Sequence, residues 1–153
     1  MKNIELNFGE YQFSTNKNKM DIPAIHDFLS NHSGWSNGIP IEKVELSIQN
    51  SLNFGIFHQN RQIGFARIIS DFATVAYLGD VYLLDDYRGK GISKKLMDFI
   101  MSHPNLQGLR RWILLTSTAD WLYEKYGFEK IPNPEIYMEL YNPNVYKDNK
   151  QPK

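Results

Sequence analysis

A short basic loop, residues 88–91 (Arg-Gly-Lys-Gly), has the residue types that hold an anion. Glycines let backbone N–H groups approach a ligand closely, and the first turn of a following helix offers unpaired N–H donors at the positive end of its dipole. Lys94 and Lys95 bring the number of cations between residues 88 and 95 to four. The loop therefore predicts a ligand that carries phosphate groups.

The elements around this loop are suited to position it. An apolar run at residues 81–84 reads as a strand and is followed by the acidic pair Asp85-Asp86. After the loop, apolar residues recur at i, i+4, i+7 and i+8, which is the spacing of one buried helix face. These residues are Ile92, Leu96, Phe99 and Ile100. A strand, a glycine loop and a helix N-terminus thus follow one another.

Two common phosphate motifs do not match. A dinucleotide fingerprint needs G-x-G-x-x-G, but Lys94 takes the third glycine position, and a G-x-x-x-x-G-K-[ST] loop is absent. The segment instead resembles the acetyl-CoA loop of the GNAT superfamily of N-acetyltransferases, [RQ]-x-x-G-x-[GA], with Arg88, Gly91 and Ser93 at the defined positions. Ser93 departs from Gly or Ala but is small enough to keep the close backbone approach. The alternative is a solvated basic start of a helix.

A second segment, A-x-x-L-Y-E-K-x-G-F at residues 119–128, resembles the A-x-x-[LF]-Y-E-K-x-G-F ending of the same family. Two motifs in the right order and spacing are far more specific than either alone. The resemblance implies that Tyr123 is the general acid that protonates the leaving CoA thiolate. Tyr123 also fits a buried position, since it follows Ala119 by four residues and precedes Tyr126 by three.

The resemblance also implies which residues bind acetyl-CoA. The strand before the loop would pair with the pantetheine arm, and a backbone N–H within it would meet the oxyanion. Thr116 stands where many members carry an asparagine that contacts CoA. The implied cofactor-binding residues are Tyr82, Leu83, Leu84, Arg88, Gly89, Lys90, Gly91, Ile92, Ser93 and Thr116.

Asp80 interrupts an apolar strand, close to where some relatives carry an acidic base. Partial desolvation there would raise the pKa of the carboxyl group toward the working range. Equally, Asp80 would be an exposed residue at a bulge or the partner of a neighbouring cation, with a water relay taking the amine proton. For the acceptor pocket the candidates are Trp35, Asn37 and Tyr77.

Composition narrows the class of protein. Lys+Arg and Asp+Glu both number 17, so no overall charge favours nucleic acid as a partner. No apolar run reaches the roughly 20 residues that a membrane span needs. Cysteine is absent, which fits a cytoplasmic protein and excludes a cysteine acyl-enzyme. The four histidines lack ligand spacing, so we expect no metal, and His103 reads as a cap at a helix C-terminus.

The pattern of elements predicts an α/β (α+β) fold with a mixed, mostly antiparallel sheet and helices on both faces, in the order of the GNAT fold. We expect one domain over residues 1–141 and a loose tail over 142–153. The expected strands lie within 1–14 and at 52–58, 62–69, 74–84, 112–115, from 128, and at 136–140. The expected helices lie at about 21–32, 40–51, from 92 to before Pro104, and 119–126.

Together these features predict direct transfer of an acetyl group from acetyl-CoA to a primary amine of a small molecule. One alternative is a protein lysine or N-terminal acetyltransferase, and another is a non-catalytic acyl-CoA-binding regulatory module. The balanced charge does not separate them. Folds of this kind frequently form homodimers.

Overall fold

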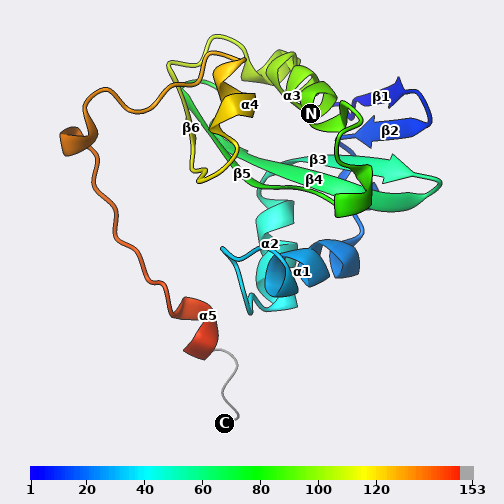
Figure 1. The fold of residues 1–153 in the computed structure, drawn as a ribbon, viewed down its shortest axis with the longest axis horizontal. Coiled ribbons are helices and arrows are strands. Elements are labelled where there is room, and N and C mark those ends of the chain that lie inside the picture. The colour runs from blue at the N-terminus through cyan, green and yellow to red at the C-terminus, as the bar shows by residue number, and fades with distance from the viewer. Residues whose placement is uncertain (149–153) are drawn as a thin grey trace.

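The computed structural model describes residues 1–148, and a single six-stranded sheet organises them. The strands lie in sequence order, every neighbouring pair is antiparallel except β5 and β6, which are parallel, and helices cover both faces (Figure 1). This mixed sheet confirms the predicted fold class. The strands are β1 (Glu5–Phe8), β2 (Tyr11–Ser14), β3 (Leu52–His58), β4 (Arg61–Ser70), β5 (Val75–Leu83) and β6 (Arg111–Leu114).

Helices α1 (Ile22–Asn31) and α2 (Ile41–Gln49) cover one face of the sheet. The side chain of Asp21 accepts a hydrogen bond from the N–H of Ala24 at 3.1 Å, so it caps the N-terminus of α1. Each helix buries one apolar stripe at helical spacing. The resulting core includes Ile25, Leu29, Val44, Ile48, Phe65 and Tyr82.

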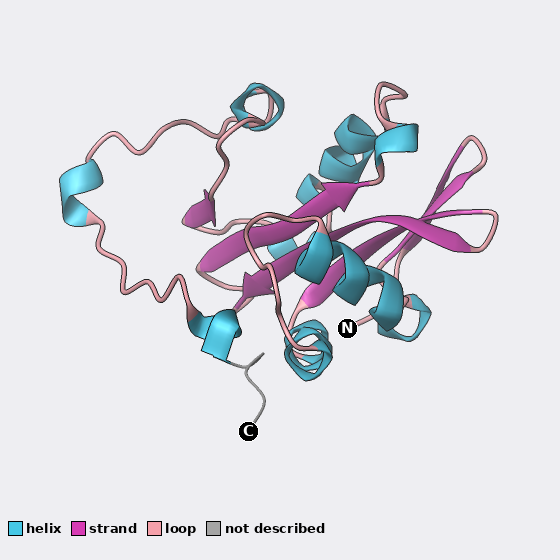
Figure 2. Cartoon of the chain, turned by 60° about the horizontal axis from the view of Figure 1, so that its bottom comes forward, coloured by secondary structure: helices cyan, strands magenta, loops and turns pink. Residues whose placement is uncertain are grey.

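Helices α3 (Ile92–Met101) and α4 (Asp120–Glu124) lie on the opposite face (Figures 1 and 2). The face of α3 predicted from its spacing is buried, since Ile92, Leu96, Phe99 and Ile100 are all within the core. The rings of Phe54 and Phe99 meet edge to face, with centroids 5.5 Å apart. This second core fixes the start of α3 at the end of β5.

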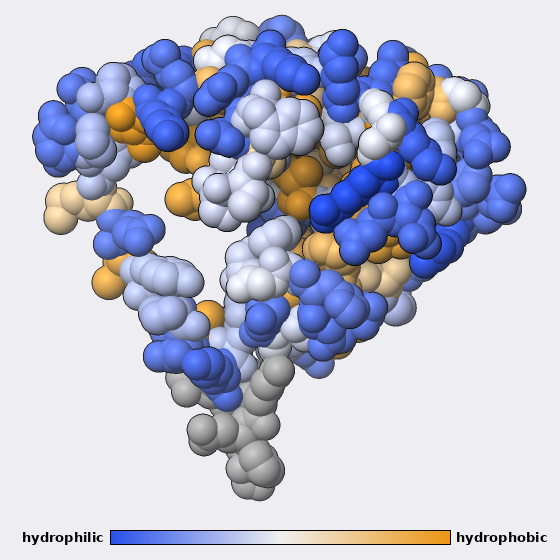
Figure 3. Space-filling view, viewed as in Figure 1, coloured by the Kyte–Doolittle hydropathy of each residue, from blue (hydrophilic) through white to orange (hydrophobic). Residues whose placement is uncertain are grey.

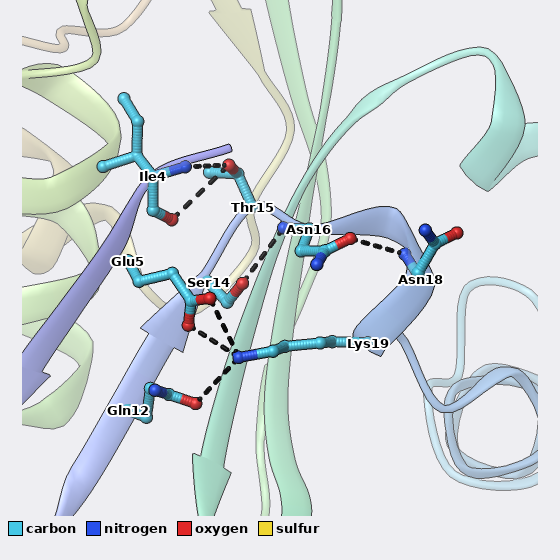
Figure 4. Close-up of polar contacts among 8 residues, drawn as sticks. All are labelled: Ile4, Glu5, Gln12, Ser14, Thr15, Asn16, Asn18 and Lys19. Carbon is cyan, nitrogen blue, oxygen red and sulfur yellow. Dashed lines mark hydrogen bonds and ion pairs between the residues drawn. The ribbon is translucent and has the colours of Figure 1, made fainter. Parts of the chain in front are cut away.

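The N-terminal strands form a hairpin that extends the sheet beyond β3. Thr15 accepts a hydrogen bond from the N–H of Ile4 at 2.9 Å, and Lys19 pairs with Glu5 at 2.7 Å and donates to Gln12 (Figure 4). Backbone pairing of β2 with β3 joins the hairpin to the rest of the sheet. The predicted strand material within residues 1–14 is therefore two strands.

Strand β5 is irregular in its middle. Phe65 pairs with Tyr82 and Arg67 with Gly79, so two residues of β5, Asp80 and Val81, oppose one residue of β4. This is a β-bulge, and Asp80 adopts φ 54° in the left-handed region, which Asp tolerates better than most residues. The pairing of β5 with β6 ends at Leu78, just before the bulge.

The C-terminal prediction of further strands is wrong within the described residues. No strand begins at Phe128, and residues 136–140 pair with no neighbour; Pro134–Ile136 instead form a short 3-10 helix. Beyond it the chain runs to α5 (Val145–Asp148), inside the expected tail, whose residues 149–153 lie outside the described part. Because residues 136–140 do not pair with the outer edge of β6, β6 is the last strand of the sheet among the described residues.

His103 also differs from its predicted role. It is buried beyond the end of α3, its Nδ1 accepts a hydrogen bond from the N–H of Asn105 at 3.1 Å, and its Nε2 has no partner among the described residues. Burial lowers the pKa of His103. It therefore begins the following turn as a neutral acceptor and does not complement the α3 dipole as a cation.

Among residues 1–148, no helix has both the length and the apolar character that crossing a membrane requires.

Candidate active site

The basic loop folds as the sequence predicts. Gly89 and Gly91 adopt φ values of 76° and 78°, a region that residues with a Cβ rarely occupy, and Gly91 is the N-cap of α3 without a side-chain cap. Within residues 1–148, the N–H groups of residues 89–94 donate to no protein acceptor. Arg88 is exposed and pairs with Asp85 at 3.2 Å, a weak surface contact that a stronger anion can replace. The loop thus presents free donors and cations at a helix N-terminus.

Beside this loop, β5 has a free edge. Its pairing with β6 covers only Val75–Leu78, whereas its pairing with β4 continues to Leu83. Because the N–H of Leu84 donates to Ile63 on β4, the alternation of a β-ladder directs the N–H of Leu83 to the opposite, open side. Residues 79–83 therefore offer backbone donors and acceptors to an extended ligand, as the sequence predicts for Leu83.

A groove of about 680 Å³ lies between α1 and the end of β5. Its aromatic part is the stacked pair Phe28 and Tyr82, with ring centroids 4.0 Å apart and planes at 8°. Burial, reinforced by Asp21 and Asp27, raises the pKa of Tyr82. The lining residues are Asp21, Ala24, Asp27, Phe28, His32, Arg61, Gln62, Tyr82, Leu84, Asp85 and Arg88. The groove thus contains three of the predicted cofactor-binding residues, together with three carboxylates, Asp21, Asp27 and Asp85, for which the sequence analysis expected no role in binding.

Asp80 sits in a polar cluster on the bulge. Its Oδ2 accepts from Arg67 Nε at 2.9 Å and its Oδ1 accepts from Trp35 Nε1 at 3.2 Å. The side chains of Arg67 and Asp80 are only 17% and 13% exposed. Burial raises the pKa of Tyr77, and Asp80 adds to this effect. The structure places Trp35, Tyr77 and Asp80 in one cluster, and Arg67 is the neighbouring cation that was one alternative for Asp80.

Arg67 is the member of this cluster that sequence reasoning missed. Like Asp80, it is a charged residue within an otherwise apolar strand, and this signal was present in the sequence. Its Nη1 also donates to Ser51 at 3.1 Å, which ties the cluster to the start of β3.

The C-terminal segment reaches the same cluster. Tyr146 of α5 packs against the α1–α2 core, and Lys43 lies over its ring at 5.5 Å. Burial raises the pKa of Tyr146, with a further contribution from Asp80 that Arg67 opposes. Tyr146 is an aromatic residue within a polar tail, which is the only sequence signal for this contact.

Tyr123 lies in the core of the α3–α4 face, against Phe128. Its ring is buried, and its hydroxyl group has no hydrogen-bond partner among the described residues and is not enclosed. Burial raises the pKa of Tyr123, so the hydroxyl group carries its proton at neutral pH. Tyr123 therefore packs in the core with its ring and still has a hydroxyl group free to interact with a ligand. Tyr126, by contrast, donates to Lys94 and Asp98, at 2.9 and 2.7 Å, and joins α4 to α3.

Two other candidates have local structural contacts. Asn37 is exposed, and its side chain accepts from the N–H of Gly34 at 3.1 Å, closing the loop that carries Trp35. Thr116 accepts from the N–H of Ala119 at 3.0 Å and so supports the start of α4. Both side chains retain exposed surface. A ligand contact by either one stays a prediction.

Comparison with known proteins identifies the family. The fold and the loop define an acyltransferase architecture, and a family model described as the acetyltransferase (GNAT) domain matches residues 50–130, more than half of the chain. The chain belongs to the GNAT acetyltransferase family.

Relatives extend this similarity beyond the matched region. A solved protein from Xanthomonas campestris pv. campestris, assigned to the GNAT family, is 48% identical with a TM-score of 0.88, over 92% of this chain and 99% of that protein. A protein from Gibberella zeae assigned as an acetyltransferase is 28% identical over 139 residues, 76% of this chain and 77% of the relative. A solved protein from Clostridium acetobutylicum, assigned as an acetyltransferase and determined with acetyl-CoA, shares the fold at 18% identity and a TM-score of 0.64, over 86% and 94% of the two chains.

Proposed function

We propose that this acetyltransferase moves the acetyl group of acetyl-CoA to a primary amine of a small molecule by direct transfer. The observation that carries the proposal is the meeting of two ligand-binding features at one place. The unpaired N–H groups at the start of α3 adjoin the free edge of β5. A pyrophosphate suits the first, and an extended chain with amide groups suits the second.

The residues present fit acetyl-CoA in detail. Arg88 and Lys90 are exposed at the loop, so they can pair with phosphate oxygens without losing a buried partner. The backbone of residues 82–84 would pair with the amide groups of pantetheine, as an added strand does. The solved relative from Clostridium acetobutylicum that was determined with acetyl-CoA supports the same ligand.

The groove supports a small cationic amine as the acceptor. Asp21, Asp27 and Asp85 line it, and the stacked rings of Phe28 and Tyr82 form an apolar surface that favours a compact organic cation. Arg61 lies in the same lining, so the carboxylates would orient a cation while this arginine holds any anionic group of the acceptor.

Direct transfer needs no nucleophilic residue of the enzyme, and the chain has no cysteine that could form an acyl-enzyme. The neutral amine nitrogen attacks the thioester carbonyl carbon, the C–S bond breaks, and the amine proton passes to water or to Asp80. The N–H of Leu83 on the free edge would stabilise the developing oxyanion, and Tyr123 would protonate the leaving thiolate.

Calorimetric titration of acetyl-CoA tests the binding step. We expect binding to the wild type and affinity at least about tenfold weaker in Arg88→Ala/Lys90→Ala, because two charge-assisted contacts are lost. Lys2→Ala/Lys17→Ala, which removes two cations from a hollow near the N-terminus, is the matched control and should bind as the wild type does.

The second step is a screen for CoA release with small amines, lysine peptides and N-terminal peptides. Turnover of small amines supports the proposal, and turnover of peptides alone would replace the acceptor class. Failure of the folded wild type to bind acetyl-CoA would overturn the proposal. Binding without turnover across the whole panel would instead indicate a regulatory module.

A further inference from the structure

Residues 85–91, which join β5 to α3 and include the basic loop, are anchored to the body of the protein by one side chain. All of these residues are exposed except Tyr87, which is partly buried and comes directly before Arg88. The Tyr87 ring packs against the core of the α3–α4 face. Lys90 Nζ lies 5.9 Å from the centre of the same ring. The position of Tyr87 therefore determines where the basic loop lies.

The hydroxyl group of Tyr87 is held by a histidine from a distant strand. His58 Nδ1 lies 2.9 Å from this hydroxyl oxygen, and the two rings meet edge to face with centroids 5.4 Å apart. On the other side of the imidazole, Nε2 lies 3.1 Å from Glu10 Oε1. Because a carboxylate only accepts hydrogen bonds, Nε2 carries the hydrogen, and Nδ1 accepts from the Tyr87 hydroxyl group.

His58 itself belongs to the sheet. It is the last residue of β3 and pairs with Tyr11 of β2 on one side and with Arg61 of β4 on the other. The Tyr11 ring contacts both His58 and Tyr87, with centroid distances of 5.1 and 6.0 Å. The His58 side chain is only 17% exposed, although hydrophilic side chains dominate the side of the body where the β1–β2 and β3–β4 turns lie (Figure 3). The sheet therefore fixes the acceptor of the bond, and the exposed segment supplies the donor.

The basic loop has little else to hold its shape. A side chain added at Gly89 or Gly91 would meet no atom within 4 Å, so no neighbouring group packs closely there. Glycine also loses more conformational freedom than other residues when it becomes ordered. A loop that is already ordered before the ligand arrives loses less entropy on binding. Contacts that fix Tyr87 should therefore increase the affinity for an anion at the loop.

We propose that His58 is a positioning residue for acetyl-CoA, because its hydrogen bond with Tyr87 holds the basic loop in the conformation that receives the pyrophosphate. This role rests on the proposed function. The loop would contact the phosphate groups and not the thioester, so His58 supports binding equally before and during acetyl transfer. Loss of such support raises KM and leaves kcat unchanged.

Two substitutions remove this bond from either side. His58→Phe keeps an aromatic ring against Tyr11 and Tyr87 but has no nitrogen acceptor, and Tyr87→Phe lacks only the hydroxyl group. We expect each to weaken acetyl-CoA binding about fivefold by calorimetry, with a matching rise in KM and with kcat at saturating acetyl-CoA within about twofold of the wild type. The double variant should bind no more weakly than the single variants, because one bond accounts for both losses.

A second ligand and a control variant separate positioning from a general structural role. S-acetylpantetheine lacks the pyrophosphate, so it should bind the wild type and His58→Phe alike, as measured by its competition with acetyl-CoA. His26→Phe removes a comparable contact, from the ring Nε2 to the carbonyl oxygen of Ile39 at 2.9 Å. It should lower the melting temperature and keep the wild-type affinity for acetyl-CoA.

The outcomes distinguish this role from the proposed function. Wild-type affinity in both single variants, losses that multiply in the double variant, or an equal loss of S-acetylpantetheine binding would each overturn the role of His58. The proposed function would then stand, because the wild type still binds acetyl-CoA. A folded wild type that does not bind acetyl-CoA would overturn both.

Discussion

Tyr123 shows how one side chain can serve both the core and a reaction. Packing against Phe128 fixes the ring, and the hydroxyl group stays unpaired. Because burial raises its pKa, the hydroxyl group is a proton donor over the whole neutral range. A general acid needs this protonation state when the thiolate leaves.

We expect Tyr123→Phe to lower kcat about 100-fold, because the substitution removes only the proton donor. Acetyl-CoA affinity by calorimetry should stay within a factor of two or so, since a phenyl ring keeps the packing. Tyr126→Phe is the matched control: it loses the bonds to Lys94 and Asp98 and should lower the melting temperature without a comparable loss of kcat. Equal kcat in Tyr123→Phe and the wild type would disprove the role.

At Asp80, the neighbours favour a positioning role. Both carboxylate oxygens already accept hydrogen bonds, from Arg67 and from Trp35, and the residue does not line the groove. The ion pair links β4 to β5 across the bulge, and the indole anchors the loop before α2. Removing one partner of a largely buried pair leaves the other charge without compensation.

We therefore expect Asp80→Asn to destabilise the protein by about 2 kcal/mol in urea unfolding, below the full value for a buried pair because both side chains retain some exposure. The acid limb of its kcat/KM pH profile should persist. Loss of that limb together with a fall of 100-fold or so in kcat would instead identify Asp80 as the base. Ser51→Ala, which removes a different partner of Arg67, controls for disturbance of the arginine alone.

At the scale of elements, the turn after α3 contains a pH-sensitive group. His103 is 2% exposed, its Nε2 has no partner among the described residues, and burial lowers its pKa. In the unfolded chain it titrates near its ordinary pKa of about 6.5. As pH falls below that value, the unfolded state takes up a proton that the folded state resists, so folding stability is lost toward acid.

His103→Asn keeps an acceptor for the N–H of Asn105 and removes the titration. We expect lower stability at pH 7.5, because a smaller side chain leaves space in the core, but a shallower fall in the free energy of unfolding from pH 7 to 5. Urea denaturation at several pH values measures this. His32→Asn, at an exposed histidine, should keep the wild-type slope; an unchanged slope in His103→Asn would show that other groups cause the acid sensitivity.

At the scale of the whole molecule, the open edge at the site follows from how far neighbouring strands pair. Strand β6 pairs with β5 only over Val75–Leu78, whereas β4 pairs with β5 as far as Leu83. The second half of β5 therefore keeps a free edge, and the N–H of Leu83 lies on it.

The sequence alone determined the features that depend on local spacing. Two motifs, helical periodicity and the glycines of the loop were sufficient to predict the α3 N-terminus, the helix faces and the family. Each of these follows from residues within a few turns of one another.

The tertiary structure decided what depends on register and on partners: the pairing of Arg67 with Asp80 across the bulge, the carboxylates gathered in the groove, and Tyr146 brought back to the α1–α2 core. Residues 136–141 have a strand pattern, but a strand needs an edge to pair with, and only the folded molecule shows that its own sheet leaves them unpaired.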